Sequence, residues 1–162
     1  MIDNYIQLEK DSVLRLGIKD SEGNYTGNFL EFDLEDTELL LRYQELMEQD
    51  KKNRIWLNNQ MVIISKKEDH KGKKLLSSNE EAELKAINEF FQKEKEVLDM
   101  FLGEGGVDKL LNGRKLGWTS LTEISKIINE QIKPFFNKTM DNITNKVKDM
   151  YKEVLENKEE VL

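Results

Sequence analysis

The single histidine of the chain, His70, has no companions that would make a catalytic or metal-binding set. It lies between Asp69 and Lys71, and the chain has no cysteine. Structural zinc prefers Cys and His ligands, so a zinc site here would need carboxylates around one imidazole. A Ser-His-Asp triad is equally unsupported. We therefore expect an exposed loop histidine, no metal, no cofactor and no enzyme activity.

Three glycines, Gly103, Gly105 and Gly106, superficially resemble a phosphate-binding loop. No Gly-Lys-Ser/Thr sequence follows them, and the turn leaves a helix instead of a strand. They instead predict the end of a helix and a tight turn, because glycine readily adopts the positive φ that such turns need. Two pairs of carboxylates could in principle do acid-base work or bind calcium, but helix capping and solvation explain them better: Glu31/Asp33 and Glu80/Glu81.

A cluster of basic residues raises the possibility of nucleic-acid binding, since clustered cations release counterions from phosphates. Only one aromatic residue, Trp56, lies among them, and the chain as a whole is acidic, with a net charge of −7. A solvated or protein-binding face is the favoured interpretation, and we expect no nucleic-acid partner. The cluster comprises Lys51, Lys52, Arg54, Lys66, Lys67, Lys71, Lys73 and Lys74.

The composition indicates helices with thin buried stripes and wide solvated faces. Of 162 residues, 38% are hydrophobic and 35% are charged, against about 25% charged in an average domain. Residues 1–36 have nine acidic and three basic residues, whereas residues 51–75 have eight basic and two acidic ones. No basic leader or run of apolar residues long enough to span a membrane is present, so we expect neither a secreted precursor nor a membrane-spanning protein, and no membrane partner.

Alternating apolar residues predict an N-terminal β-hairpin. Leu14, Leu16 and Ile18 alternate with polar residues, and a second alternation at Leu30, Phe32 and Leu34 follows the turn-rich segment 20–24. A two-stranded hairpin is marginal alone. We therefore expect its apolar face to pack on a helix or to pair with another strand.

Helical spacing dominates the rest of the chain. A first helix begins after Leu34, and we favour its continuation through Met61–Ile64, although that segment also has strand-like composition. A charged loop follows over Lys66–Lys74. Ser78 with Glu81 predicts a capping box at the start of the next helix, which should end at Gly103.

Beyond Gly103 the pattern predicts a short apolar helix that stops at Gly113, and then a capping box formed by Ser120 and Glu123. Pro134 interrupts the following helix, so we expect a kink or break near Gln131 to Lys133, because proline lacks the backbone donor and clashes with the preceding turn.

After Pro134, apolar residues recur in alternating steps of three and four, which is typical of a coiled-coil seam. This stripe either packs on the chain's own helices or forms an intermolecular groove. We divide the chain into a β-hairpin plus helical domain over residues 1–133 and an amphipathic C-terminal helix over 134–162, which could belong to the same domain. The candidate partner-binding residues are Phe136, Met140, Ile143, Val147, Met150 and Val154.

The chain resembles the small tail assembly chaperones of phages and phage-like tail particles from Gram-positive hosts. The sharpest part of the likeness is the Asp-x-Phe-x-Gly element at Asp99, Phe101 and Gly103, with Gly106 after it. The hairpin, a helix entered at Asp33–Met47, a capped middle helix and a helix through Pro134 occur in the same order. Candidate residues of this structural corner or its core are Tyr43, Phe90, Phe91, Phe101, Gly103 and Trp118.

The resemblance implies a cytoplasmic, non-catalytic role in which the protein binds the long helical tape measure protein and keeps it soluble until the tail tube assembles. Tail tube subunits are a further partner that it implies, and self-association stays open. The alternatives are a structural tail or connector component and a small nucleic-acid-binding regulator. The expected fold is α+β and predominantly helical: an N-terminal β-hairpin packed on a bundle of long helices, with an amphipathic C-terminal helix.

Overall fold

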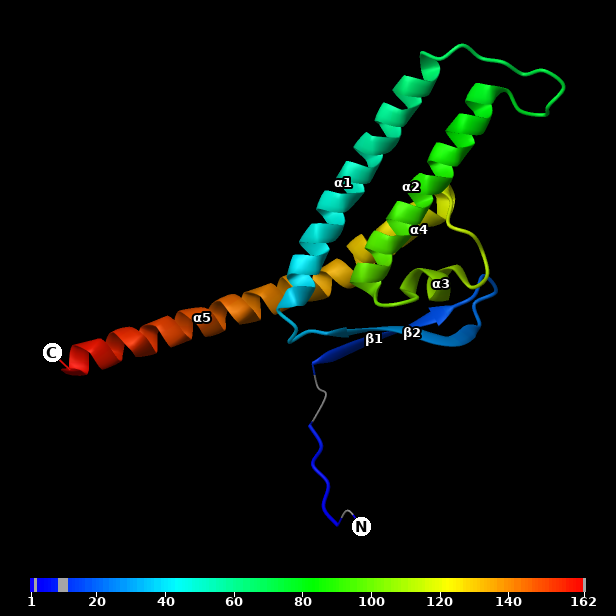
Figure 1. Cartoon of the computed structure of the whole chain (residues 1–162). Coiled ribbons are helices and arrows are strands. Elements are labelled where there is room, and N and C mark those ends of the chain that lie inside the picture. The colour runs from blue at the N-terminus through cyan, green and yellow to red at the C-terminus, as the bar shows by residue number, and fades with distance from the viewer. Residues whose placement is uncertain (2, 9–11, 162) are drawn as a thin grey trace.

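The computed structural model describes residues 1, 3–8 and 12–161; residue 162, the last of the expected C-terminal unit, lies outside that range. A β-hairpin lies beneath a pair of long helices, and one further helix projects sideways from the place where these parts meet (Figure 1). The predicted α+β, mostly helical class is confirmed.

The hairpin pairs β1 (Val13–Lys19) with β2 (Tyr25–Asp33) in antiparallel register, with Leu14 opposite Phe32 and Leu16 opposite Leu30. Because residues opposite each other share a face, the two predicted alternations form one apolar surface. The Asp20 carboxylate closes the turn by accepting hydrogen bonds from the backbone N–H groups of Glu22 and Asn24.

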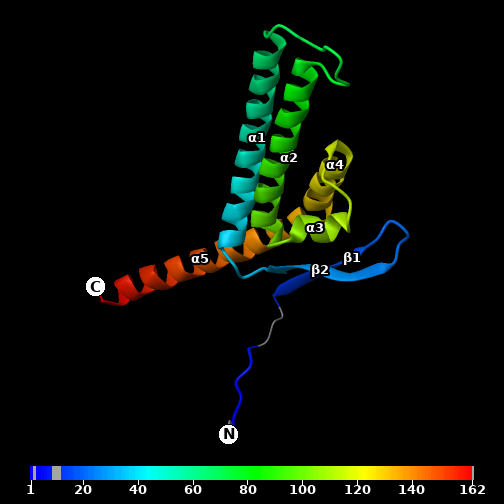
Figure 2. The same ribbon diagram turned by 45° about the vertical axis from the view of Figure 1, so that its right-hand side comes forward.

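The long pair consists of α1 (Glu38–Ser65) and α2 (Ser78–Leu102), which lie side by side in both views (Figures 1 and 2). Helix α1 continues through Met61–Ile64, which confirms the favoured interpretation. The loop over residues 66–77 joins the helices at their far end. The capping box uses Ser77 and Glu80, one residue earlier than predicted, because the Ser78 hydroxyl is used by the loop, where it accepts from the His70 N–H.

Two shorter helices follow, α3 (Gly106–Leu111) and α4 (Trp118–Ile127). The second predicted capping box is wrong, because the helix begins before Ser120. Ser120 is already in the first turn of α4, and its hydroxyl accepts a hydrogen bond from the N–H of Gly117 at 2.8 Å.

The chain stays helical through Pro134, but in altered form. Segment η1 (Ile128–Ile132) is a π-helix, in which the N–H of Lys133 bonds to the carbonyl of Ile128, and α5 (Lys133–Val161) follows directly. The wider turn gives room to the proline ring, which would clash with the carbonyl four residues earlier in a regular α-helix. Figure 2 shows the change of direction between α4 and α5.

The core lies where the hairpin, the lower ends of α1 and α2, and η1 meet. Four aromatic residues from β2, α1, α2 and the first turn of α5 gather there: Phe32, Tyr43, Phe101 and Phe136. Their ring centroids lie 5.6 to 6.1 Å apart in five contacting pairs. Ile132 and Val107 are fully buried beside the same cluster. This cluster is what holds the first turn of α5 to the body.

Candidate partner-binding site

The candidate site is an apolar stripe on α5 that the rest of the chain leaves uncovered. Met140, Val147, Met150 and Val154 are between 52% and 66% exposed, and Ile143 is half-buried. Helix α5 leaves the body after its first turns and runs outward in both views (Figures 1 and 2). The sequence left two alternatives for the stripe, packing on the chain's own helices or an intermolecular groove. Packing on the chain's own helices is seen only at the beginning of α5.

Phe136, the first predicted partner-binding residue, lies elsewhere. Its side chain is 2% exposed and packs against Phe32 and Phe101 in the core. It is therefore not available to a partner in this conformation. The prediction was wrong because a spacing of four residues from Met140 places both residues on one side of a helix but does not determine what covers them.

Two residues that the sequence analysis did not select also belong to the exposed surface. Tyr151 and Leu155 are 65% and 44% exposed, and they follow Val147 at steps of four. Side chains four residues apart lie on the same face of a helix, so this spacing could have identified them. We call the whole surface the α5 stripe: Met140, Ile143, Val147, Met150, Tyr151, Val154 and Leu155.

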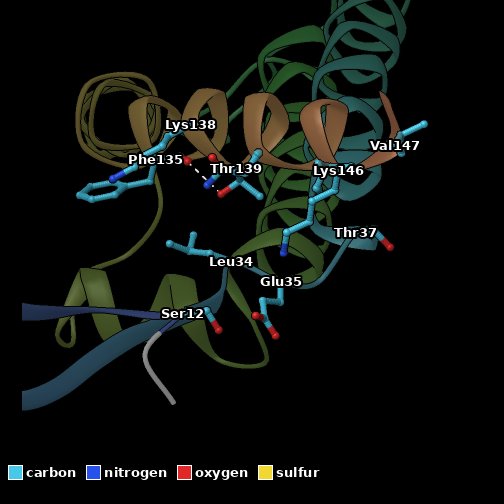
Figure 3. A pocket seen from close by; sticks show the side chains of 11 residues that line it. Ser12, Leu34, Glu35, Thr37, Phe135, Lys138, Thr139, Lys146 and Val147 are labelled. Carbon is cyan, nitrogen blue, oxygen red and sulfur yellow. Dashed lines mark hydrogen bonds between the residues drawn. The ribbon is translucent and has the colours of Figure 1, made fainter. Parts of the chain in front are cut away.

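A hollow borders the stripe where α5 passes the connection between β2 and α1. Its volume is about 730 Å³. Figure 3 shows Phe135, Thr139 and Lys146 on the α5 side and Leu34 and Glu35 opposite them. We call this hollow the α5 groove; its lining includes Ser12, Leu34, Glu35, Thr37, Phe135, Lys138, Thr139, Asn142, Ile143, Lys146 and Val147.

The glycine corner docks the end of α2 and the start of α3 onto the hairpin. Gly103 ends α2 with φ +100°, as its predicted role requires, and the Asp99 carboxylate accepts a hydrogen bond from the N–H of Val107 at 2.9 Å. A Cβ on Gly106 would lie 2.7 Å from the Cβ of Leu102 and 3.6 Å from Leu30 of β2. Only glycine permits this approach without movement.

The six predicted corner residues divide into separate groups. Tyr43 and Phe101 belong to the core cluster next to Gly103. Phe90, Phe91 and Trp118 form a second aromatic group, with ring centroids 4.9 to 5.4 Å apart, where α4 packs on α2. The six residues therefore gather at two points along α2, and Trp118 of the second group is 50% exposed.

The remaining candidates for chemistry have structural partners or are solvated. His70 is exposed in the loop and lies 4.0 Å from Glu68. Glu31 pairs with Arg15 at 2.9 Å, and Glu80 belongs to the capping box. Among the residues that the structure describes, no three His, Cys, Asp or Glu side chains gather as a metal site would require.

One carboxyl group is buried between α1 and α2. Glu94 is 1% exposed and accepts a hydrogen bond from the Asn53 amide at 3.1 Å. Its pKa is raised to about 7, mainly by burial and in addition by hydrogen bonding with Asp50. Asp50 itself pairs with Arg54 at 3.0 Å. These four residues form a polar layer in an otherwise apolar helix interface.

The basic cluster is spread over α1 and its far end. Five of its lysines are in the loop that joins α1 to α2, opposite the acidic hairpin end of the molecule (Figure 1). Trp56, its one aromatic residue, is half-buried, and the Lys93 ammonium lies 4.9 Å from the centre of its ring. One face of the ring therefore contacts a cation from α2.

Comparisons of the chain with protein-family models, with curated proteins and with solved structures found no match. None of the helices in the described part of the chain has the length and apolar content needed to cross a lipid bilayer.

Proposed function

We propose that this protein is a tail assembly chaperone, which binds the tape measure protein of a phage or phage-like tail in the host cytoplasm and keeps it soluble during assembly. The proposal assigns it no catalysis and no cofactor. The observation that carries it is the α5 stripe, a row of seven apolar side chains on α5. Only the first turns of this helix contact the body. The sequence resemblance supplies the identity of the partner.

The α5 stripe suits a helical partner for two physical reasons. Apolar residues at steps of three and four form a seam into which a second amphipathic helix can pack. Met140 and Met150 are flexible and polarizable, so they adapt to partner stripes that differ in detail. A tape measure helix has many such stripes, and it would aggregate if they stayed exposed.

The test replaces two stripe residues by charged ones and measures binding. Val147→Glu with Met150→Glu should abolish co-purification with a co-expressed tape measure fragment, because burying an unpaired carboxylate in an apolar interface is costly. A matched control, Asn145→Glu with Lys152→Gln, changes the net charge equally on the opposite side of α5 and should leave binding intact.

Thermal unfolding of both variants separates loss of binding from loss of fold. An unchanged midpoint with binding lost only in the stripe variant supports the proposal. Binding that survives in the stripe variant, or that is lost equally in the control, would remove the α5 stripe from the partner surface. Global unfolding of the stripe variant would show that these side chains are core.

A further inference from the structure

The N-terminal arm, residues 1–11, carries a second uncovered apolar group. Within its described part, Tyr5, Ile6 and Leu8 are 84%, 98% and 83% exposed. They belong to the segment of residues 3–8, which precedes β1 and extends away from the body (Figure 1). Three large apolar side chains within four positions are a costly arrangement in water, so a surface that accepts them would be occupied readily.

The α5 groove begins where the arm joins the hairpin, because Ser12 is one of its lining residues. Its α5 wall presents apolar Phe135, Ile143 and Val147, and Leu34 lies on the opposite side. The groove therefore offers apolar contacts next to the point from which the arm extends.

Chain length and charge both fit the arm to this groove. The seven Cα-to-Cα steps from Tyr5 to Ser12 can span roughly 23 Å when extended, and the α5 wall from Phe135 to Val147 is about 18 Å long. The arm sequence has three acidic residues and one lysine, whereas the groove lining has two lysines, Lys138 and Lys146, and one acidic residue, Glu35. The net charges of the arm and the groove lining are therefore opposite in sign and attract.

We propose that the chain's own N-terminal arm docks lengthwise in the α5 groove, with Tyr5, Ile6 and Leu8 against its apolar wall. The occupant is the arm of the same chain, since a short tether gives an effective concentration on the order of millimolar. The docked arm covers Ile143 and Val147, which also belong to the α5 stripe. It therefore competes with the partner. This competition rests on the proposed function, whereas the docking itself does not rest on it.

The absence of cysteine makes the docking directly measurable in the full chain. Gln7→Cys with Asn142→Cys places one thiol on the arm and one in the groove. Under mild oxidation this pair should form an intrachain disulfide at least about tenfold faster than Gln7→Cys with Asn59→Cys, whose second site is about 30 Å along α1 from Glu38. Equal rates for the two pairs, or disulfides only between chains, would overturn the proposal.

Two further pairs of substitutions test which contacts hold the arm. Ile6→Ser with Leu8→Ser should slow the cross-link on the order of tenfold without changing the fold, because both side chains are exposed outside β1. Lys138→Glu with Lys146→Glu should also slow it. The matched control, Lys148→Glu with Lys152→Glu, changes the charge equally outside the groove lining and should leave the rate unchanged. Insensitivity to both test pairs would contradict docking.

Deleting residues 1–8 tests the competition separately. The shortened chain should bind the tape measure fragment several-fold more tightly, as expected when a competing segment is removed. Unchanged affinity alongside a rapid cross-link would refute the competition and leave the docking established. A fragment that binds neither chain would refute the proposed function, while the cross-linking result would still decide whether the arm docks.

Discussion

Helices α2 and α5 have the same kind of apolar spacing and opposite surroundings. In α2, Phe90, Leu98 and Phe101 are buried, whereas Val147 and Met150 of α5 are more than half exposed. Helix α2 has α1 beside it along its length, and α5 contacts the body only at its start (Figures 1 and 2). Periodicity thus predicts that a stripe exists, but burial needs a second surface that the stripe itself does not specify.

A polar layer distinguishes the two helices further. The buried face of α2 includes Glu94, which forms hydrogen bonds with Asn53 and Asp50 of α1. A buried polar group costs free energy unless a partner satisfies it, so such a layer favours one alignment of two helices over shifted ones. The α5 stripe has no carboxylate or amide member, which suits a surface that accepts several related partners.

The largest expected effect comes from opening the core at the base of α2. Phe101→Ala should reduce the free energy of unfolding by about 3 to 5 kcal/mol, because it removes a ring packed against Phe32, Tyr43 and Phe136. Met150→Ala on α5 should change it by no more than about 0.5 kcal/mol. Urea unfolding measures both. Similar losses would show that α5 packs on the body in solution.

The second prediction concerns pH and the layer around Glu94. The pKa of this carboxyl is raised from its usual 4.5 to about 7 in the folded chain. Between these pH values the folded state therefore holds more protons than the unfolded state, and stability falls as the pH rises. At 1.36 kcal/mol per pKa unit, the loss across this window is about 3 kcal/mol.

The control for this pH dependence is Glu94→Gln, which has no proton to lose. The difference in unfolding free energy between parent and variant should change across the window and flatten above it. The pKa values of Asp36 and Asp69 are lowered by hydrogen bonds from Arg42 and Asn79, respectively. Their contributions are lost only as the pH falls below the usual 3.8, outside this window. A parent and variant with parallel pH profiles would show that Glu94 is ionised throughout.

The third prediction concerns the glycine that ends α2. Gly103 has φ +100° and ψ 160°, a region that is essentially restricted to glycine, and no atom lies within 4 Å of a Cβ built there. Gly103→Ala should therefore cost about 1 to 3 kcal/mol through backbone strain alone. Gly117→Ala, at an ordinary φ of −142° and also in open space, should cost no more than about 0.5 kcal/mol. Equal melting of the two variants would contradict this assignment.

Local patterns in the sequence predict most of the fold. The alternation of Leu14 and Leu16, the long helical spacing and the turn at Gly103 each report the local geometry of a few neighbouring residues, and each was found where expected. The errors at the caps have local causes too. Two consecutive serines, Ser77 and Ser78, each precede a glutamate by three residues, so the sequence allows two positions for the capping box. Ser77 forms the cap because the Ser78 hydroxyl accepts a hydrogen bond from the loop.

The candidate site is less predictable because it depends on contacts between distant segments. Phe136 and Met140 have equivalent places in the apolar pattern, yet only Phe136 meets the rings from β2 and α2. Pro134 predicted a kink or break in the helix, and the structure has a π-helical turn before it instead of a break. The reason is that Ile132 before the proline and Phe136 after it are both packed in the core. Neither outcome follows from spacing alone.

The smallest expected effect is that of removing the outer half of α5. A chain that ends at Val147 loses Met150, Tyr151, Val154 and Leu155, all of which are at least 44% exposed. Its unfolding free energy should stay within about 0.5 kcal/mol of the parent, because surface changes away from the core contribute little. Its circular dichroism should show fewer helical residues, and its urea midpoint should be unchanged.

A lowered midpoint in this shortened chain would show that the outer half of α5 is packed in solution, either on the body or on a second copy. Sedimentation separates these cases, since packing on a second copy makes the parent heavier than a monomer and makes its midpoint depend on concentration. An unchanged midpoint combined with lost binding to the tape measure fragment would sharpen the comparison with α2. The two helices would then differ in whether their second surface is supplied within the chain or by a partner.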